Sequence, residues 1–119
     1  DKDIPITDEI HKLTQSKCIN LGGKTNLGDA IDIMSLCTTI ISNDSGLMHI
    51  AAALNKKLIA IFGSSNPHHT PPMHPDAVIA YLALACSPCF KRECPLKAEA
   101  HMACLNNITS SDVINKIDL

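Results

Sequence analysis

The stretch from Ile40 to Leu54, with the sequence IISNDSGLMHIAAAL, constrains the fold of this chain more than any other. It opens with the β-branched pair Ile40–Ile41, which is typical of a strand covered on both faces. The polar run Asn43–Ser45 follows, and residues of these types cap the amino ends of helices. Gly46 then allows a ligand or another backbone to approach closely. The pattern predicts a buried strand, a sharp turn and a helix.

The helix predicted after this turn carries one apolar stripe, at positions i, i+3, i+4 and i+7. The stripe consists of Leu47, Ile50, Ala51 and Leu54, and the other side chains point elsewhere. The first free amides of such a helix face the crevice at the carboxyl end of the strand. Open α/β sheets bind ligands in that crevice, and the amino end of a helix favours anions. A capped turn without any ligand would explain a bare Asp-Ser-Gly sequence as well.

Strand and helix patterns alternate along the rest of the chain, which predicts a doubly wound parallel α/β sheet. Strands are expected at Cys18–Leu21, Ile40–Ser42, Leu58–Phe62 and Ala77–Ala80. Further helices are expected within Asp3–Ser16 with Thr7 or Asp8 as the cap, after Thr25 or Asn26, and after Ser110 or Ser111. The segment Gly63–Pro72 reads as a loop because it is rich in Gly, Ser, Asn and Pro.

Composition excludes several classes of protein. Of the 119 residues, 45% are apolar, which is typical of a globular chain with a core. The net charge is −2, from 10 basic and 12 acidic residues, and no basic block offers a nucleic-acid face. No apolar run approaches the roughly 20 residues of a membrane span. The chain also has no Walker A loop, no Gly-x-Gly-x-x-Gly and no Gly-x-Ser-x-Gly elbow.

Four cysteines, spaced Cys-x2-Cys-x4-Cys-x9-Cys, form a second constellation. They are Cys86, Cys89, Cys94 and Cys104. Four thiols so close in sequence could bind a structural zinc ion tetrahedrally. Disulfide bonds and reduced, packed thiols remain as alternatives, because the spacing does not consist of two Cys-x-x-Cys motifs.

The central run Asn-Asp-Ser-Gly-Leu-Met-His-x-Ala-Ala-Ala-Leu resembles the nucleotide-sugar-binding signature of ADP-heptose lipopolysaccharide heptosyltransferases, glycosyltransferase family 9. The heptosyltransferase II branch is the most similar, and the resemblance spans roughly Lys2 to Leu119. It implies a Rossmann-like sheet, the carboxyl-terminal half of a two-domain GT-B enzyme. Residues 1–119 would then be an ADP-heptose-binding domain, incomplete at its amino end and without the acceptor domain.

Donor-binding residues follow from the resemblance, position by position. The motif that contacts the donor in the family corresponds here to Asp44, Ser45, Gly46 and His49. Thr25 lies where a second family loop meets the donor, and the adjacent Lys24 would add positive charge near phosphate. Lys2–Asp3 is similar to the end of the family's Gly-Ser-x-Lys-Asp segment, which would place Asp3 near the ribose. Alternatively, Thr25 is a helix cap, Lys24 is solvated and His49 packs on a helix flank.

The family's reaction inverts the anomeric centre of heptose by direct displacement of ADP. The resemblance implies that the acceptor, the lipopolysaccharide inner core, binds the amino-terminal half, which also supplies the general base. No residue of this sequence is therefore expected to be catalytic, and the chain alone is expected to transfer no heptose. No cofactor is implied beyond the candidate zinc. The expected location is the cytoplasm, or the cytoplasmic face of the inner membrane by peripheral association.

Two other classes of function remain open from the sequence. One is a module that binds a nucleotide or a nucleotide sugar without chemistry. The other is a small structural domain stapled by metal at the four cysteines. Metal analysis together with titration of ADP would separate these alternatives.

Overall fold

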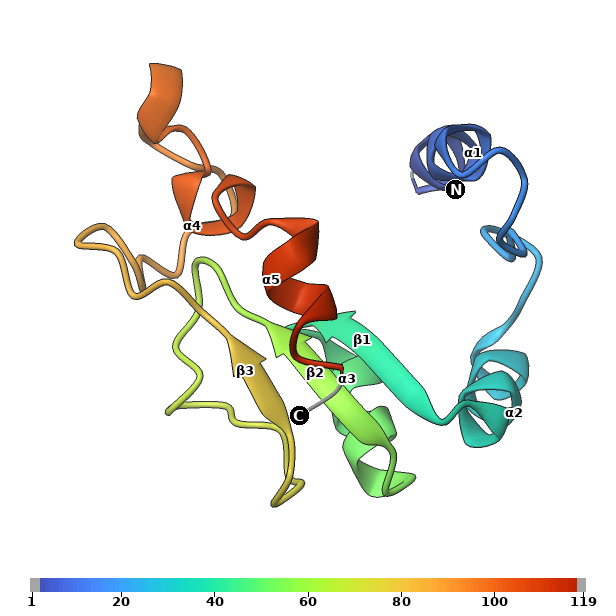
Figure 1. Cartoon of the computed structure of the whole chain (residues 1–119). Coiled ribbons are helices and arrows are strands. Elements are labelled where there is room, and N and C mark those ends of the chain that lie inside the picture. The colour runs from blue at the N-terminus through green and yellow to red at the C-terminus, as the bar shows by residue number, and fades with distance from the viewer. Residues whose placement is uncertain (1–2, 118–119) are drawn as a thin grey trace. The chain divides into compact units, whose positions relative to one another are not determined.

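A three-stranded parallel sheet lies at the centre of the larger part of the chain (Figure 1). Its strands are β1 (Thr39–Asn43), β2 (Lys57–Ile61) and β3 (Val78–Ala80), in the spatial order β1-β2-β3. Ile41 pairs with Ile59, which in turn pairs with Val78. The three strands expected from about residue 40 onward are confirmed, with ends within one residue of the prediction. Their parallel pairing is confirmed as well.

The computed structural model describes residues 3–117. These residues form two compact units, one up to Ile33 and one from Met34 onward. The sheet belongs to the second unit. Among the described residues, no helix has the length and apolar character needed to cross a bilayer.

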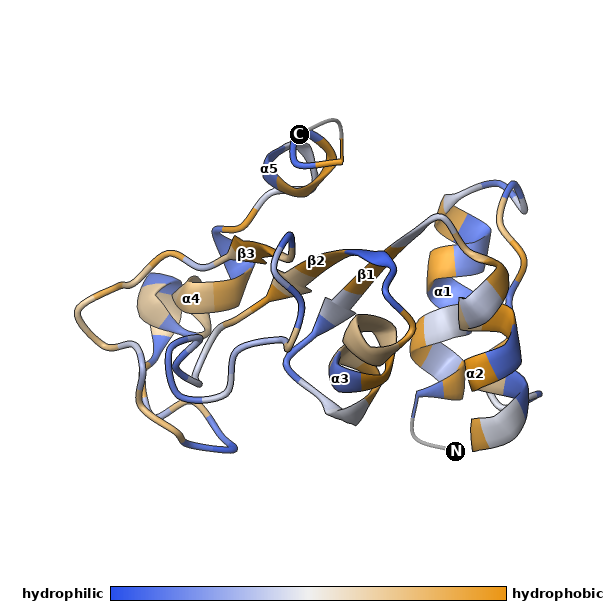
Figure 2. Ribbon diagram, turned by 90° about the horizontal axis from the view of Figure 1, so that it is seen from below, coloured by the Kyte–Doolittle hydropathy of each residue, from blue (hydrophilic) through white to orange (hydrophobic). Residues whose placement is uncertain are grey.

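Helices cover both faces of the sheet, as a doubly wound arrangement requires. Figure 2 shows α3 (Gly46–Ala53) on one side of the strands and α5 (Ser110–Ile114) on the other. The α5 side chains Val113 and Ile114 line a shallow groove with Ile41 and Ile61 of the sheet. Side chains alternate between the two faces of a strand, so Ile41 and Ile61 face away from α3.

The core lies between α3 and the sheet. Its buried side chains are Met48, Ala51 and Ala52 of the helix and Leu58, Ala60 and Phe62 of the chain at β2. Burying a Leu, Met or Phe side chain stabilises the fold by about 1.5–3 kcal/mol each. Two small alanines let the helix approach the strands closely, and Met48 fills the remaining space.

The prediction of the buried face of α3 was wrong by about one position. Of the expected stripe only Ala51 is buried, while Leu47 is 42% exposed and Met48 is fully buried. Both faces of this helix are rich in apolar residues, so periodicity alone does not decide between them. Close approach of the helix to the strands favours burial of the side that carries the adjacent alanines Ala51 and Ala52. The helix ends with Leu54 as the cap and Asn55 in the left-handed conformation.

The connection from β2 to β3, residues 62–77, contains no helix. Four prolines interrupt it: Pro67, Pro71, Pro72 and Pro75. Proline lacks an amide proton and clashes with the preceding helical turn, so a crossover helix cannot form here. The loop predicted at Gly63–Pro72 is confirmed.

The smaller unit contains α1 (Ile4–Leu13) and the beginning of α2 (Leu27–Leu36). The strand predicted at Cys18–Leu21 is wrong, because no other strand pairs with it. The Asn20 side chain instead donates to Asp8 (2.8 Å) and accepts from the amide of Gly22 (2.9 Å). A strand exists only in a ladder, so an isolated apolar run remains irregular.

Helix caps are the other local difference from the sequence predictions. α1 follows Asp3 rather than Thr7 or Asp8, with proline in its first turn. Of the two caps predicted for α2, Asn26 is confirmed, because it exchanges 3.0 Å hydrogen bonds with Asp29. Thr109 rather than Ser110 or Ser111 caps α5, in a capping box with Asp112. The Thr109 hydroxyl and amide donate to Asp112 and hold the pKa of its carboxyl below its usual range.

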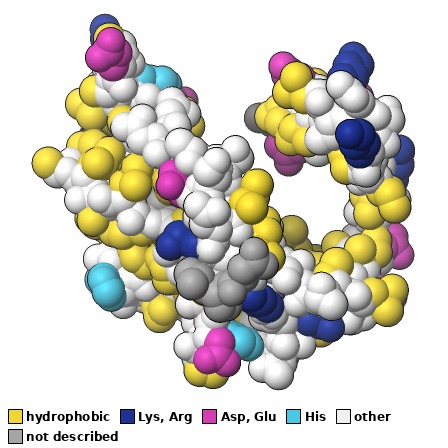
Figure 3. All heavy atoms as spheres, viewed as in Figure 1, with side chains coloured by type: hydrophobic (Ala, Val, Ile, Leu, Met, Phe, Trp, Pro, Cys, Tyr) yellow, Lys and Arg dark blue, Asp and Glu magenta, His cyan; other side chains and the backbone are white. Residues whose placement is uncertain are grey.

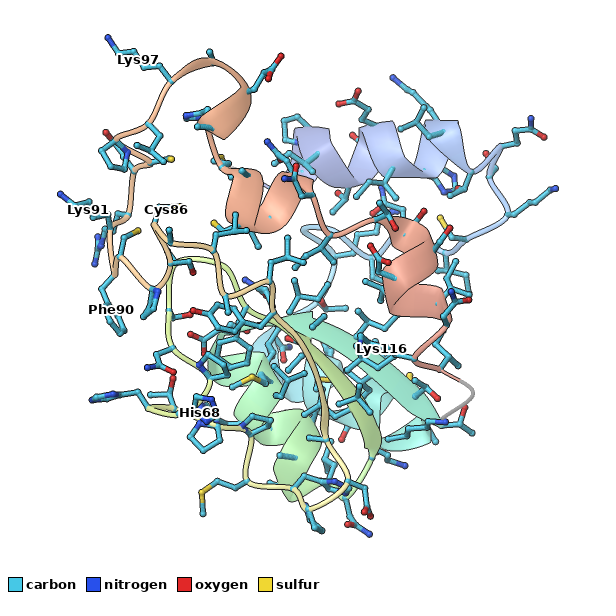
Figure 4. The ribbon with its side chains drawn as sticks, turned by 60° about the vertical axis from the view of Figure 1, so that its left-hand side comes forward. His68, Cys86, Phe90, Lys91, Lys97 and Lys116 are labelled. Atoms are coloured by element: carbon cyan, nitrogen blue, oxygen red, sulfur yellow. The ribbon has the colours of Figure 1, made fainter. Side chains whose placement is uncertain are left out.

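Residues 81–107, which we call the cysteine segment, follow β3 with little regular structure. They contain one 3-10 turn, η1 (Ala98–Ala100), and the short helix α4 (Ala103–Asn106). The sequence of this segment shows no helical or strand periodicity of apolar residues, which agrees with its irregular structure. Hydrophobic side chains reach the surface here (Figure 3), and Phe90 is 62% exposed. Figure 4 shows Phe90, Lys91 and Lys97 pointing outward from the segment.

Candidate functional site

The site predicted at the carboxyl edge of the sheet is built on two neighbouring strand ends. Asn43, the last residue of β1, lies opposite Ile61, the last residue of β2. The amide of Asp44 donates to the carbonyl of Ile61 at 3.1 Å, so the turn after β1 is tied to the end of β2. This hydrogen bond fixes where α3 begins relative to the sheet.

The first turn of α3 offers three consecutive amides. Ser45 is the N-cap residue, with an extended backbone at φ −156° and ψ 172°, but its side chain makes no capping hydrogen bond. The amides of Ser45, Gly46 and Leu47 therefore donate to no acceptor among residues 3–117, whereas the amide of Met48 donates to the Ser45 carbonyl at 3.1 Å. Free amides at the positive end of a helix dipole form an anion-binding arrangement.

The space in front of these amides is open. Apart from its chain neighbours and the backbone of α3 itself, a Cβ built on Gly46 would meet no atom of the described residues within 4 Å. Gly46 and His49 are exposed, and Asp44 and Ser45 are half-buried. The glycine is therefore not needed to relieve a clash or strain within this chain. The structure brings together the four candidate residues that lie in this turn and helix.

The other candidate residues belong to the smaller unit. Asp3 is exposed and precedes α1, where its carbonyl accepts from the amide of Thr7. The Lys24 ammonium group donates to the carbonyl of Asn20 at 3.0 Å, and Thr25 is exposed just before the cap of α2. Lys2 lies outside the described residues. These positions belong to a different unit of the chain from the turn at Asp44.

The four clustered cysteines line one cavity of about 70 Å³ in the cysteine segment. No disulfide bond joins them. Burial, together with the nearby thiols of Cys86, Cys89 and Cys94, raises the pKa of the Cys104 thiol. Within the part of the chain that the structure describes, no three metal-binding side chains stand in an arrangement that would hold an ion.

Sequence reasoning missed the link between the cysteine segment and the sheet edge. The Ser64 carbonyl accepts from the amide of Phe90 at 2.7 Å, and the Gly63 carbonyl accepts from the Ser87 hydroxyl. A Cβ on Gly63 would come within 2.6 Å of the Leu105 side chain, so the segment packs directly on this glycine. The only sequence signal was a glycine placed directly after a buried strand.

Comparison with known proteins gives a consistent result. Residues 1–100 match the model of a family described as glycosyltransferase family 9 (heptosyltransferase). The chain is 47% identical over 85 residues to a lipooligosaccharide heptosyltransferase 2 of Haemophilus influenzae, covering 68% of this chain and 25% of that protein. It is 38% identical over 104 residues to lipopolysaccharide heptosyltransferase 2 of Escherichia coli, covering 87% and 29% respectively.

A solved structure is similar over almost the whole chain. It is described as ADP-heptose lps heptosyltransferase II of E. coli, and it superposes with a TM-score of 0.77 at 34% identity. The match covers 98% of this chain and 33% of that one. The chain thus spans between a quarter and a third of the length of these similar proteins.

Proposed function

The chain belongs to glycosyltransferase family 9, the heptosyltransferases, and from that membership we propose that it forms the donor-binding part of a lipopolysaccharide heptosyltransferase. The donor would be ADP-L-glycero-D-manno-heptose, and the acceptor would be the inner core of lipopolysaccharide. The observation that carries this proposal is the set of three free amides at the start of α3, beside the end of β2.

The proposed task of this part is to stabilise the departing ADP. As the acceptor oxygen bonds to the anomeric carbon, the bond from that carbon to the diphosphate breaks and its electron pair leaves with ADP. The negative charge on the leaving phosphate grows during this step. Amides already aimed at that position, with the helix dipole behind them, stabilise the charge without reorganisation. The amides of Ser45, Gly46 and Leu47 fit this role.

Side chains around the turn have separate proposed roles. Asp44 would accept hydrogen bonds from hydroxyl groups of the sugar or ribose, because a carboxylate repels phosphate. The exposed imidazole of His49 would donate to a phosphate oxygen. Thr25 is available for the donor because Asn26 caps α2 in its place. Lys24 would add positive charge near phosphate, and Asp3 would contact the ribose.

The general base is proposed to lie in the part of the enzyme that holds the acceptor, outside this chain. A nucleotide-sugar donor implies that the reaction occurs in the cytoplasm or at the cytoplasmic face of the inner membrane. No cofactor takes part in the proposed displacement, because the reaction involves no oxidation or reduction and backbone amides stabilise the leaving phosphate.

Titration of the purified protein with ADP, followed by amide chemical shifts, tests this proposal. The amides of Ser45, Gly46 and Leu47 should shift first and most. Shifts confined to residues 55–57 and 74–76, at the opposite edge of the sheet, would contradict donor binding at α3. Perturbation of the cysteine segment alone would contradict it equally.

Replacing Asp44 by asparagine separates sugar recognition from helix stability. The Asp44 side chain makes no hydrogen bond among the described residues, and Ser45 holds the N-cap position, so thermal unfolding should be unchanged. Loss of a charge-assisted hydrogen bond should weaken calorimetric binding of ADP-heptose by about 1.5–3 kcal/mol. Asp76→Asn is the matched control, because Asp76 lies at the opposite edge of the sheet. Equal affinities for both variants would remove Asp44 from the donor site.

A further inference from the structure

The cysteine segment lacks the means by which a chain of its length usually keeps one conformation. None of its side chains between residues 81 and 107 is buried, and its helices span three and four residues. Fixing the backbone costs about 1–2 kcal/mol per residue, which burial of apolar surface normally offsets. Its hydrogen bonds to Gly63 and Ser64 hold the beginning of the segment, and Leu105 packs on Gly63 near its end. Another source of order is needed between these two points.

The four thiols provide a candidate for that source, because they meet around one cavity. Cys86, Cys89, Cys94 and Cys104 all line it, although they come from both sides of the η1 turn. The rest of the wall is apolar: Pro95, Leu96, Ala100, Met102 and Ala103. The volume of about 70 Å³ exceeds the roughly 30 Å³ of a water molecule. The lining therefore offers four soft ligands, and thiolates of this kind select zinc over hard cations.

Charge around the thiols distinguishes a metal from disulfide bonds. An adjoining cavity is lined by Cys89, Cys94 and Cys104 together with Lys91 and Arg92. Four thiolates around one Zn²⁺ carry a net charge of −2, which the guanidinium group of Arg92 would partly balance. Disulfide bonds are neutral and need no neighbouring cations.

We propose that Cys86, Cys89, Cys94 and Cys104 bind a single zinc ion that cross-links the cysteine segment and holds it in one conformation. On binding, each thiol loses its proton to the solvent and forms one Zn–S bond of about 2.3 Å. The sulfurs line the wall of the cavity, so rotation of the four side chains must bring them to the ion. No oxidant or reductant takes part. The inference does not depend on the donor site.

Metal content and thiol reactivity test the zinc site directly. The protein, purified without chelator from cells supplied with Zn²⁺, should contain about one equivalent of zinc. Two of its six thiols should react readily, and all six should react after a chelator removes the metal. The chelator should also lower the melting temperature, because the free energy of metal binding contributes to folding. Cobalt added to the metal-free protein should give the strong absorption of tetrahedral thiolate coordination.

Substitutions locate the metal within the chain. Cys89→Ser should lose most of the bound zinc, whereas Cys18→Ser should keep one equivalent, because Cys18 lies outside the cluster. The cobalt spectrum of the unsubstituted protein decides the question if Cys89→Ser fails to fold. Six reactive thiols and no zinc in the native protein would overturn the proposal. A mass two hydrogens lower for each bridge would also overturn it, in favour of disulfide bonds.

Discussion

Replacing Gly46 by alanine is expected to weaken the binding of ADP by roughly a hundredfold while leaving thermal unfolding unchanged. Beyond the neighbouring backbone, no atom of residues 3–117 lies within 4 Å of the added Cβ, so the fold accepts the methyl group. A diphosphate bound to the amides of Gly46 and Leu47 would occupy that same space. Loss of two hydrogen bonds to a charged group costs about 3 kcal/mol or more, which corresponds to roughly that factor in Kd.

Ser45→Thr is the matched control for this experiment. Its extended backbone suits a β-branched residue, and the hydroxyl remains. Calorimetric titration with ADP should therefore give nearly the affinity of the unsubstituted protein for Ser45→Thr. If Gly46→Ala binds equally well, the ligand does not contact these amides, and the proposed function of the turn is wrong.

Phe62→Ala is expected to have the largest effect on stability, lowering the free energy of unfolding by about 3–5 kcal/mol. Phe62 is completely buried and packs in the same cluster as Met48 of α3. Its amide also donates to the carbonyl of Ala80 at 2.9 Å, so collapse of the chain around the cavity would disturb the pairing with β3. A typical domain is stable by only about 5–15 kcal/mol, which makes this loss severe.

The free energies of unfolding of Phe62→Ala and Phe90→Ala, measured with denaturant, test this prediction. Phe90 is 62% exposed, and its ring meets His69 edge-on with centroids 6.3 Å apart. Its truncation should cost less than about 1 kcal/mol, because little apolar surface is lost from the interior. Similar losses for the two variants would show that the core does not lie between α3 and the sheet.

The sheet and its main turn could be predicted because their signals are local. The continuous apolar run at Leu58–Phe62 and the polar turn at Asp44 each fit one kind of structure. The strand at Cys18–Leu21 could not be judged this way, since a strand depends on a partner elsewhere in the chain. The face of α3 depended on how closely two alanines approach the strands, which a helical period does not describe.

The candidate site was predictable to a similar degree. The residues at the start of α3 follow from one continuous motif, and the structure brings them together. That Ser45 leaves the amides open depends on the direction of one side chain, which no sequence pattern specifies. The spacing of the cysteines indicated that they could meet. It did not indicate that Lys91 and Arg92 would line the neighbouring cavity.

The proline-rich connection between β2 and β3 determines where the chain can change in length. Along β2, Leu58 and Ala60 pack toward α3, while Ile61 lines the groove on the face that carries α5. An inserted residue within this strand would exchange the two faces for every residue beyond it. The same insertion beside Met73, which is 84% exposed, would add much less than the roughly 0.6 kcal/mol that doubling a loop costs. Insertions and deletions should therefore accumulate at residues 66–76, with the strands on either side unchanged in length.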